Sequence, residues 1–494
     1  MLGLNSFNTA SQNQLIGAYG NDIVKVSTNT GFGINLTTTE KIRFDNFLAS
    51  LFFQNYTDTP LTYNGTVWTR KHVAKVPLAK FLKAWKERMY FGYIKIGSTE
   101  YPSRVWYSDL PINDTIQWGY ERGTNLTTTA GSNLVGSANA GFKTYDLEIG
   151  DPFFIISGSD IGEYRIKAII QDQQVTLNDY NGNATTLTTT ATGVSFWAGG
   201  NWFDVERDDG DFLTGLTSNF NQLIIFKRES LYRYNGFSTD QIRNTPGTTA
   251  SDSIVNIRDW CIYFFGGVST ETGFYAYDGT EGFKISNGIQ KYIDGIDSGM
   301  YTTIVGWKEG SLARFYVGDI SNTNYNISIS NAVITLDYDS KAWSVDPIGK
   351  VIENATEFRQ GGVKTSFIAD PDEVFETPSG FTFDGTPVKW TFTTKPIYPE
   401  GTAWNNTFTK LQIISENSSG VKVSYRRRFQ PFNSDDNFTP LGDIRNDNQI
   451  FIYPEDKNRS SGVEIRFDGI STTEPVAVIK KLTQYYVKET TYIG

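Results

Sequence analysis

The sequence predicts an all-β protein: a β-propeller of about six blades, with a small β domain inserted into it and a β-sandwich at its C-terminal end. Aromatic residues make up 15% of the chain, and it contains 46 glycines. Aromatic side chains suit a pleated, half-buried sheet, and glycine supplies the positive φ angles of tight hairpins. Two further observations are a repeat of strand-like runs, each ending in a turn, and a change to plainly alternating strands near residue 400.

The repeats extend from about residue 40 to 395. The first reads FLASLFFQN and then LTYNGTVWT, with an Asn-Gly turn at Asn64, and the second reads RMYFGYIKI and then RVWYSDLPINDTIQW. The clearest pair is NQLIIFKRESLYRYNG and DWCIYFFGGVSTETGFYAYDG, whose turns at Asn235 and Asp278 lie 43 residues apart. A period of this length, with an apolar strand, a polar turn and an aromatic strand in each unit, is typical of propeller blades.

Two later repeats complete the count. RFYVGD with ITLDYDSKAWSV turns at Asp339, and VKTSFIADPDEVFE with FDGTPVKWTF turns at Asp384, 45 residues further on. Because the interval from Asp278 to Asp339 is 61 residues, one connection is longer, and five or seven blades are also compatible with the pattern.

A different pattern interrupts the repeats. The low-complexity segment 124–142 reads as a flexible loop, and three strand candidates follow it: DLEIGDPFFIISG, GEYRIKAIIQ and QQVTLNDY. After residue 400 the strands FTKLQIISE, VKVSYRRRF, QIFIYP, GVEIRF and AVIKKLTQYYVKE predict a separate sandwich. The predicted division is 1–122, an N-terminal segment with the first blades; 123–200, the inserted domain; 201–398, the remaining blades; and 399–494, the sandwich. Within KVPLAKFLKAWKERMY a helix and a strand pairing are equally compatible with the spacing of Leu78, Leu82 and Trp85.

Charge and composition narrow the classes of function. The net charge is -10, which argues against a protein that wraps nucleic acid by neutralising phosphates, but suits the wall of a channel through which DNA slides. The N-terminus lacks the pattern of a signal peptide and no run approaches 18 apolar residues, so we expect synthesis in the cytoplasm and no membrane insertion. A single cysteine rules out an internal disulfide framework.

Few residues qualify as a chemical site. His72 is the only histidine and lies in a basic stretch, and Cys261 in RDWCIYFF reads as a small core residue. The densest acidic cluster, VERDDGDF, could hold calcium through oxygen ligands, although a solvated turn is the commoner outcome and the EF-hand spacing is absent. Its carboxylates are those of Glu206, Asp208, Asp209 and Asp211.

The remaining charged groups read as turns or as a sheet face. Asp370, Asp372 and Glu373 in ADPDE, and Asp435 with Asp436 in NSDDN, are typical of polar turns. Arg426 and Arg428 in SYRRRF would share one face of a strand, where a phosphate or a carboxylate could bind, although an ordinary exposed face is commoner. We therefore expect no catalytic, cofactor-binding or metal-binding residue, and no cofactor.

The runs NQLIIFKRESLYRYNG, SDSIVNIRDWCIYFFGG and GFYAYDG resemble the repeat of propeller proteins in the tails of short-tailed bacteriophages, described as nozzle, hub or DNA-stabilisation proteins. YPSRVWYSDLPINDTIQW and the C-terminal strands fit the same pattern, so the resemblance covers about residues 40 to 490, without the insertion. It implies a structural, non-enzymatic virion protein: a homo-oligomeric ring, hexameric by expectation, around the DNA exit channel. Its implied partners are portal or adaptor proteins, tail fibres or spikes, and double-stranded DNA passing without specific contacts.

Two alternatives stay open at this stage. One is a receptor-binding or glycan-binding tail protein on a propeller scaffold, with glycan degradation by paired carboxylates as a further option. The other is a receptor-binding spike or fibre base, which threefold symmetry and glycan affinity would distinguish.

Overall fold

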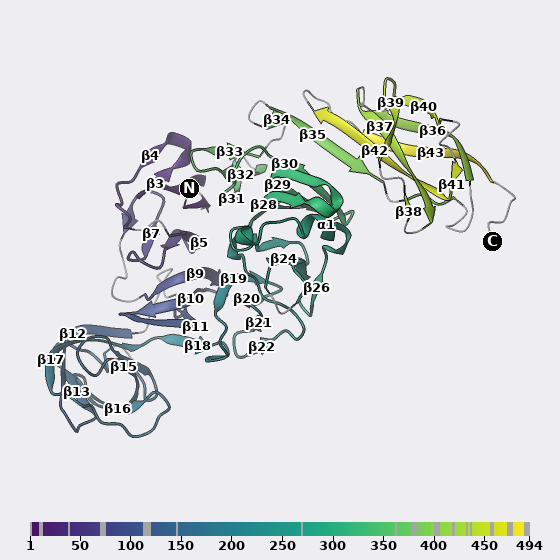
Figure 1. The fold of residues 1–494 in the computed structure, drawn as a ribbon. Helices are drawn as coiled ribbons and strands as arrows, with labels where there is room; N and C mark the ends of the chain where they lie inside the picture. The colour runs from purple at the N-terminus through teal and green to yellow at the C-terminus, as the bar shows by residue number, and fades with distance from the viewer. Residues whose placement is uncertain are drawn as a thin grey trace. The chain divides into compact units, whose positions relative to one another are not determined.

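The computed structural model describes most of the chain. The described residues are 2–8, 13–37, 40–69, 76–111, 120–144, 147–267, 270–360, 363–377, 382–383, 386–394, 396–399, 406–416, 420–430, 433–434, 437–454, 459–471 and 478–488. These residues fold almost entirely into β-strands, as predicted (Figure 1). They form two compact units, the first made of residues 1–343 and 349–376 and the second of residues 344–348 and 377–494.

The first unit is a β-propeller with seven blades among the described residues. Six blades have four antiparallel strands and the seventh has three. The strands of the first three blades are β1 Gly3–Asn8, β2 Asn13–Tyr19, β3 Asp22–Lys25 and β4 Thr30–Gly31; β5 Arg43–Phe47, β6 Ser50–Gln54, β7 Leu61–Tyr63 and β8 Trp68–Thr69; β9 Leu78–Trp85, β10 Arg88–Ile96, β11 Thr99–Tyr107 and β18 Asn201–Asp204.

The other four blades follow in chain order. Their strands are β19 Leu213–Asn219, β20 Gln222–Lys227, β21 Leu231–Tyr234 and β22 Thr239–Gln241; β23 Val255–Ile257, β24 Trp260–Phe265, β25 Gly273–Tyr277 and β26 Gly282–Lys284; β27 Val305–Glu309, β28 Leu312–Asn322, β29 Ile327–Asp337 and β30 Ala342–Pro347; β31 Asn354–Gln360, β32 Val363–Ala369 and β33 Val374–Glu376. Only one short α-helix is present in the described chain, α1 Gln290–Ile293, and no described helix has the length and apolar character that a membrane crossing requires.

The first strands of the blades form the ring. β1 contacts β5, β5 contacts β9 and β9 contacts β19, while β31 contacts both β27 and β1 and so closes the circle. The closing seam is a small apolar cluster in which Leu4 and Leu15 of the first blade pack with Phe358 and Ala369 of the last. The prediction of about six blades missed the first blade, because its strands precede the region in which the repeat was recognised.

The predicted turns have one shared geometry in three blades. In each, the side chain of Asn or Asp accepts hydrogen bonds from the two backbone N–H groups that follow the glycine, and the preceding tyrosine hydroxyl donates to the glycine carbonyl at 2.7 to 2.9 Å. The three turns are Tyr63-Asn64-Gly65, Tyr234-Asn235-Gly236 and Tyr277-Asp278-Gly279, and all three glycines have positive φ. The repeat therefore marks the hairpin between the third and fourth strands of a blade.

The ambiguous segment near Leu78 forms a hairpin of β9 and β10, not a helix. Its two-residue turn, Lys86-Glu87, has positive φ at both positions. The spacing of its buried residues explains why the pattern was ambiguous, since Ala79, Leu82 and Trp85 lie three residues apart.

A closed six-stranded barrel is inserted into the third blade between β11 and β18. Its strands pair in the order β12-β13-β16-β15-β14-β17, and β17 pairs again with β12. Phe142, Phe153 and Phe196 fill its interior together with aliphatic residues. The strands are β12 Tyr120–Thr128, β13 Leu134–Ser137, β14 Pro152–Ile155, β15 Gly162–Gln171, β16 Gln174–Asp179 and β17 Ala191–Gly199.

The second unit consists of two antiparallel sheets around one apolar core. One sheet contains β34 Thr382–Phe383, β35 Thr386–Thr393, β37 Lys422–Gln430, β38 Asn433–Ser434, β39 Thr439–Asp443 and β42 Gly462–Ser471; the other contains β36 Asn406–Glu416, β40 Asn448–Ile452, β41 Arg459–Ser460 and β43 Val478–Lys488. The assignment of FDGTPVKWTF to the last blade was wrong, because β35 pairs with β42 of this unit. The turn predicted at Asp384 lies outside the described residues.

Candidate functional site

A cavity of about 430 Å³ lies beside the third blade, against β11 and the loop that follows β18. Two chain segments supply nearly all of its wall, which combines aromatic and charged side chains. We call it the Tyr101 pocket; its lining residues are Tyr93, Thr99, Glu100, Tyr101, Pro102, Ser103, Arg104, Asp204, Arg207, Asp208, Gly210, Asp211 and Phe212.

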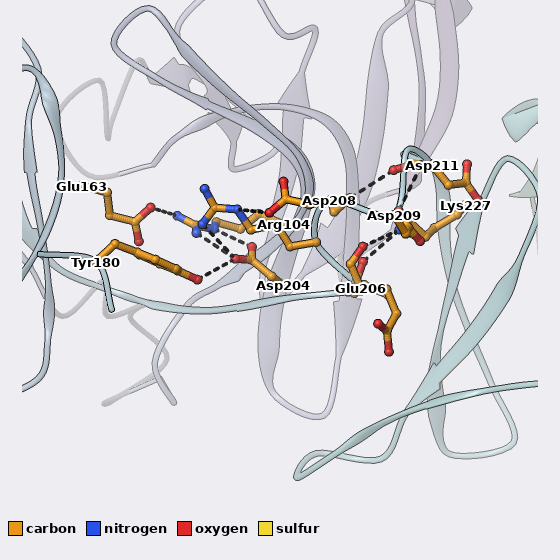
Figure 2. A network of polar contacts seen from close by, with 12 residues as sticks. Arg104, Glu163, Tyr180, Asp204, Glu206, Asp208, Asp209, Asp211 and Lys227 are labelled. Atoms are coloured by element: carbon orange, nitrogen blue, oxygen red, sulfur yellow. Dashed lines mark hydrogen bonds and ion pairs between the residues drawn. The ribbon is translucent and has the colours of Figure 1, made fainter. Parts of the chain in front are cut away.

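Arg104 forms the inner wall of the Tyr101 pocket. The side chain is fully buried on β11, opposite Asp204 of β18 in the strand register. Its Nε and Nη2 donate to the two carboxylate oxygens of Asp204 at 2.8 and 2.9 Å, and its Nη1 donates to Glu163 of the barrel at 3.0 Å (Figure 2). A bidentate pair of this kind fixes both position and orientation, so Arg104 ties the barrel to the blade.

Two aromatic rings pack against this guanidinium. The Arg104 Cζ atom lies 3.6 Å from the centroid of the Trp202 ring and 4.2 Å from that of Tyr101. Such cation–π contacts gain strength where water is excluded. Burial raises the pKa of Tyr101 to about 12, so its hydroxyl stays neutral and able to donate a hydrogen bond across the physiological range.

Glu163 is the least satisfied member of the network. Its side chain is only 7% exposed, and its Oε1 atom has no hydrogen-bond partner among the described residues. Burial raises the pKa of Glu163 above the usual value of a glutamate, and Arg104 counteracts this only in part. A carboxyl group in such an environment keeps its proton to higher pH than an exposed one.

The turn that carries the predicted acidic cluster forms one side of the Tyr101 pocket, its acidic rim, with Asp208 and Asp211 in the wall. Asp209 binds the ammonium group of the fully buried Lys227 at 2.6 Å, and Asp211 accepts hydrogen bonds from the backbone N–H groups of Arg228 and Glu229. The side chain of Asp208 is 87% exposed. The cluster is therefore a turn held by Lys227 and the backbone that follows it, and among the described residues no three His, Cys, Asp or Glu side chains group in a way that could hold a metal ion.

The charge of the Tyr101 pocket is negative. Its described wall carries four carboxylates against two guanidinium groups, those of Arg104 and Arg207. Arg104 is already satisfied by its carboxylate partners, and the nearest ion-pair contacts of Arg207 are 3.9 Å to Asp204 and 3.7 Å to Asp208. This electrostatic balance disfavours an anionic ligand and permits a neutral one that offers hydroxyl groups.

A second cavity, of about 290 Å³, is lined by the first strands of consecutive blades. Its charged side chains are already paired: Arg43 and Lys41 with Asp252, and Lys83 with Asp45 at 2.9 Å. The Lys83 pair joins the second and third blades, and the pairs with Asp252 join the second blade to the segment before the fifth. These pairs leave little free charge for a ligand.

The other residues singled out from the sequence have structural roles where they are described. Cys261 is fully buried in the core between two blades, and burial raises the pKa of its thiol, as expected for a core residue. Asp370 accepts hydrogen bonds from the backbone N–H groups of Asp372 and Glu373, which confirms a polar turn. His72, Asp435 and Asp436 lie outside the described residues.

Arg426 and Arg428 share one face of β37, as predicted, and the carboxylate that they bind belongs to the same sheet. Both donate to the carboxylate of Glu464 on the neighbouring strand β42, with Nε distances of 2.8 and 3.0 Å. The side chain of Glu464 is 6% exposed, so the two arginines stabilise the sheet.

No family model and no curated protein matches the sequence. Among solved structures, similarity is found to the phage phi92 endosialidase, with a TM-score of 0.21 and 10% identity over 87% of this chain; the chain spans 64% of the length of that protein. It is also found to a mutant of Trypanosoma rangeli sialidase displaying trans-sialidase activity, with a TM-score of 0.31, 8% identity and coverage of 95% and 94% of the two chains. The same sialidase in complex with the inhibitor DANA matches with a TM-score of 0.31, 7% identity and coverage of 96% and 95%.

These matches contradict the sequence-based expectation of a protein without enzymatic activity, since an endosialidase and a sialidase are enzymes. The propeller itself follows from the chain's own blades and their ring of contacts.

Proposed function

We propose that the protein is a glycan-binding β-propeller protein of a bacteriophage tail, and that the Tyr101 pocket binds the sugar. The observation that carries this proposal is the composition of the wall, in which Tyr93, Tyr101 and Phe212 alternate with carboxylates and guanidinium groups. Sugar rings stack their C–H faces on aromatic rings, and charged side chains hydrogen-bond the hydroxyl groups. The volume of about 430 Å³ lies within the range of small-molecule sites.

The negative wall narrows the ligand to a neutral glycan. Glu100, Asp208 and Asp211 would repel the carboxylate or sulfate of an acidic sugar, whereas Glu100 and Asp208 can accept hydrogen bonds from sugar hydroxyls. The location in a phage tail is supported by the resemblance of the blade repeats to phage tail propellers.

A glycan array probed with the full-length protein tests the proposal, followed by calorimetry on the sugars that bind. In Phe212→Ala the loss of one stacking ring lowers the affinity for a bound sugar by roughly tenfold, equivalent to about 1.4 kcal/mol. Phe237→Ala is the matched control, because Phe237 is 98% exposed on the turn of the fourth blade. Release of reducing ends is measured in the same incubations, so that hydrolysis is detected together with binding.

Two results count against a glycan site in the Tyr101 pocket. One is an array on which no glycan is bound or cleaved. The other is a bound glycan whose affinity is the same in Phe212→Ala and in the wild type.

A nozzle or hub ring around the DNA path is the second candidate function. The C-terminal unit contains 14 Lys and Arg and 14 Asp and Glu residues, so the propeller unit carries the entire net charge of -10. An acidic ring would let DNA slide past without adhering. Native mass spectrometry combined with electron microscopy of the virion tests this: a closed ring, sixfold by expectation, around an axial channel supports it, and absence of the protein from tails contradicts it.

A further inference from the structure

The sheet made of β40, β36 and β43 in the C-terminal unit has an apolar outer face. Its inner face supplies Phe408, Leu411, Ile413 and Phe451 to the core. The residues that alternate with these lie on the outer face, and four large apolar side chains there are exposed. These are Ile450 at 51%, Ile452 at 73%, Tyr485 at 45% and Val487 at 60% exposed.

The strand register places these side chains on the two sides of β36, whose outward side chains include Lys410 and Gln412. Lys410 of β36 lies opposite Ile452 on one side and Tyr485 on the other, and Gln412 lies opposite Ile450. The Tyr485 hydroxyl donates to Gln412 Oε1 at 2.9 Å, which holds the ring against its neighbour. We call this surface the β40–β36–β43 face. Large apolar side chains exposed together on one face of a sheet commonly mark an interaction site.

The charge of the face is positive. Lys410 and Lys481 are exposed on it, and the one acidic residue of these three strands, Glu416 at the end of β36, is paired with Lys480. In the propeller unit of the same chain acidic residues outnumber basic residues by ten, whereas in the C-terminal unit the two numbers are equal. The chain therefore carries a positive apolar face and a strongly negative unit, which are complementary between two copies.

We propose that the β40–β36–β43 face binds the acidic propeller unit of a second copy of this chain. Apolar contact supplies the affinity, and the lysines select an acidic partner and raise the rate of association. An interface between two different surfaces of identical chains is heterologous, so repetition of it gives a closed ring or an open filament.

Sedimentation velocity of the full-length protein over a range of concentrations tests the proposal, at low and at high salt. The wild type associates as concentration rises, and high salt weakens the association. Ile452→Glu and Lys410→Glu each raise the dissociation constant by roughly tenfold or more, because each adds a negative charge to a surface that meets an acidic one. Lys422→Glu is the matched control, because Lys422 is exposed on β37, in the other sheet of the same unit, and undergoes the same reversal of charge.

Circular dichroism confirms that each variant is folded, which the exposure of the substituted side chains leads us to expect. A wild type that stays monomeric at every concentration overturns the proposal, as does an association that Ile452→Glu leaves intact. A third result overturns the assignment of the acidic unit as partner. In this result Ile452→Glu abolishes the association, but Lys410→Glu and high salt leave it unchanged.

Discussion

The Gln222 side-chain oxygen lies 3.0 Å from the Tyr277 hydroxyl, and this contact joins the fourth propeller blade to the fifth. The same contact occurs between the first and second blades, where the Tyr63 hydroxyl lies 2.8 Å from Gln14 Oε1. Both glutamines follow an asparagine and precede Leu-Ile in their strands, so the sequence NQLI occurs twice. The repeated tyrosine thus serves two purposes: it closes its own turn and it contacts the preceding blade.

Replacing Tyr277 by phenylalanine removes this hydroxyl without changing the packing of the ring. The Gly279 carbonyl and the Gln222 amide then lose a partner, so the free energy of unfolding of the propeller falls by about 1 kcal/mol. Tyr19→Phe, at a tyrosine that is 47% exposed, is the control. Urea denaturation followed by tryptophan fluorescence measures both variants; equal stability of Tyr277→Phe and wild type would show that the contact contributes nothing.

The propeller was predictable from the sequence to the extent that its turns are local. An Asn-Gly or Asp-Gly pair after a tyrosine specifies a hairpin within a few residues, whatever the rest of the fold. The first blade lacked this signal, because its third strand leads into a short 3₁₀ turn at Val26–Thr28 and not into such a pair. The sequence pattern also did not reveal that β18 completes the third blade, since β18 lies more than ninety residues beyond β11.

Lys227 positions the acidic rim of the Tyr101 pocket. Its buried ammonium group donates to the carbonyls of Val205 and Glu206 and to Asp209. In Lys227→Met these acceptors lose their donor, and the free energy of unfolding falls by about 3 kcal/mol. The rim also loosens, so the affinity for a bound glycan drops. Lys167→Met, at an exposed lysine of the barrel, is the control, and a change in stability below about 1 kcal/mol would contradict the assigned role.

Asp160 makes the stability of the barrel depend on pH. Burial alone would raise the pKa of Asp160, but hydrogen bonds from the Thr188 and Thr189 hydroxyls and backbone N–H groups lower it to about 2. A carboxyl group whose pKa is lower in the folded state stabilises the fold above its unfolded pKa, near 4, and this contribution is lost as the pH falls towards 2.

In Asp160→Asn the contribution is absent at every pH. We therefore expect the variant to be less stable than the wild type by about 2 kcal/mol at neutral pH and the difference to shrink between about pH 5 and pH 2. Hydrogen exchange of the barrel amides at several pH values measures it, with Asp208→Asn as the exposed control. A difference that stays constant with pH would contradict the role of the carboxylate.

The candidate site was only partly predictable. The acidic cluster at the rim was recognised from composition. Its partner Lys227 lies in another strand, and the pairing of Lys227 with Asp209 depends on tertiary packing. Arg104 gave a weak signal, an arginine within the apolar run RVWY. Its contact with Glu163 joins residues 59 positions apart in two different domains, and neither turn chemistry nor strand periodicity reports such a pair.

Gly200 links the barrel to the third blade and has no room for a side chain. Its φ is +97°, a conformation that disfavours other residues, and a Cβ atom there would overlap with the ring of Trp106, which is fully buried in the core of the blade. Gly200→Ala must therefore displace Trp106 or change the backbone angle, and we expect the free energy of unfolding to fall by about 3 kcal/mol from overpacking and backbone strain together.

Gly182→Ala separates the two causes, because φ is also positive there, +84°, but no atom lies within 4 Å of the position that a Cβ would take. That control loses only about 1 kcal/mol by strain alone. Thermal melting measures both variants, and limited proteolysis near residue 200 reports whether the link between barrel and blade has opened; equal losses in the two variants would show that strain, and not contact with Trp106, determines the need for glycine.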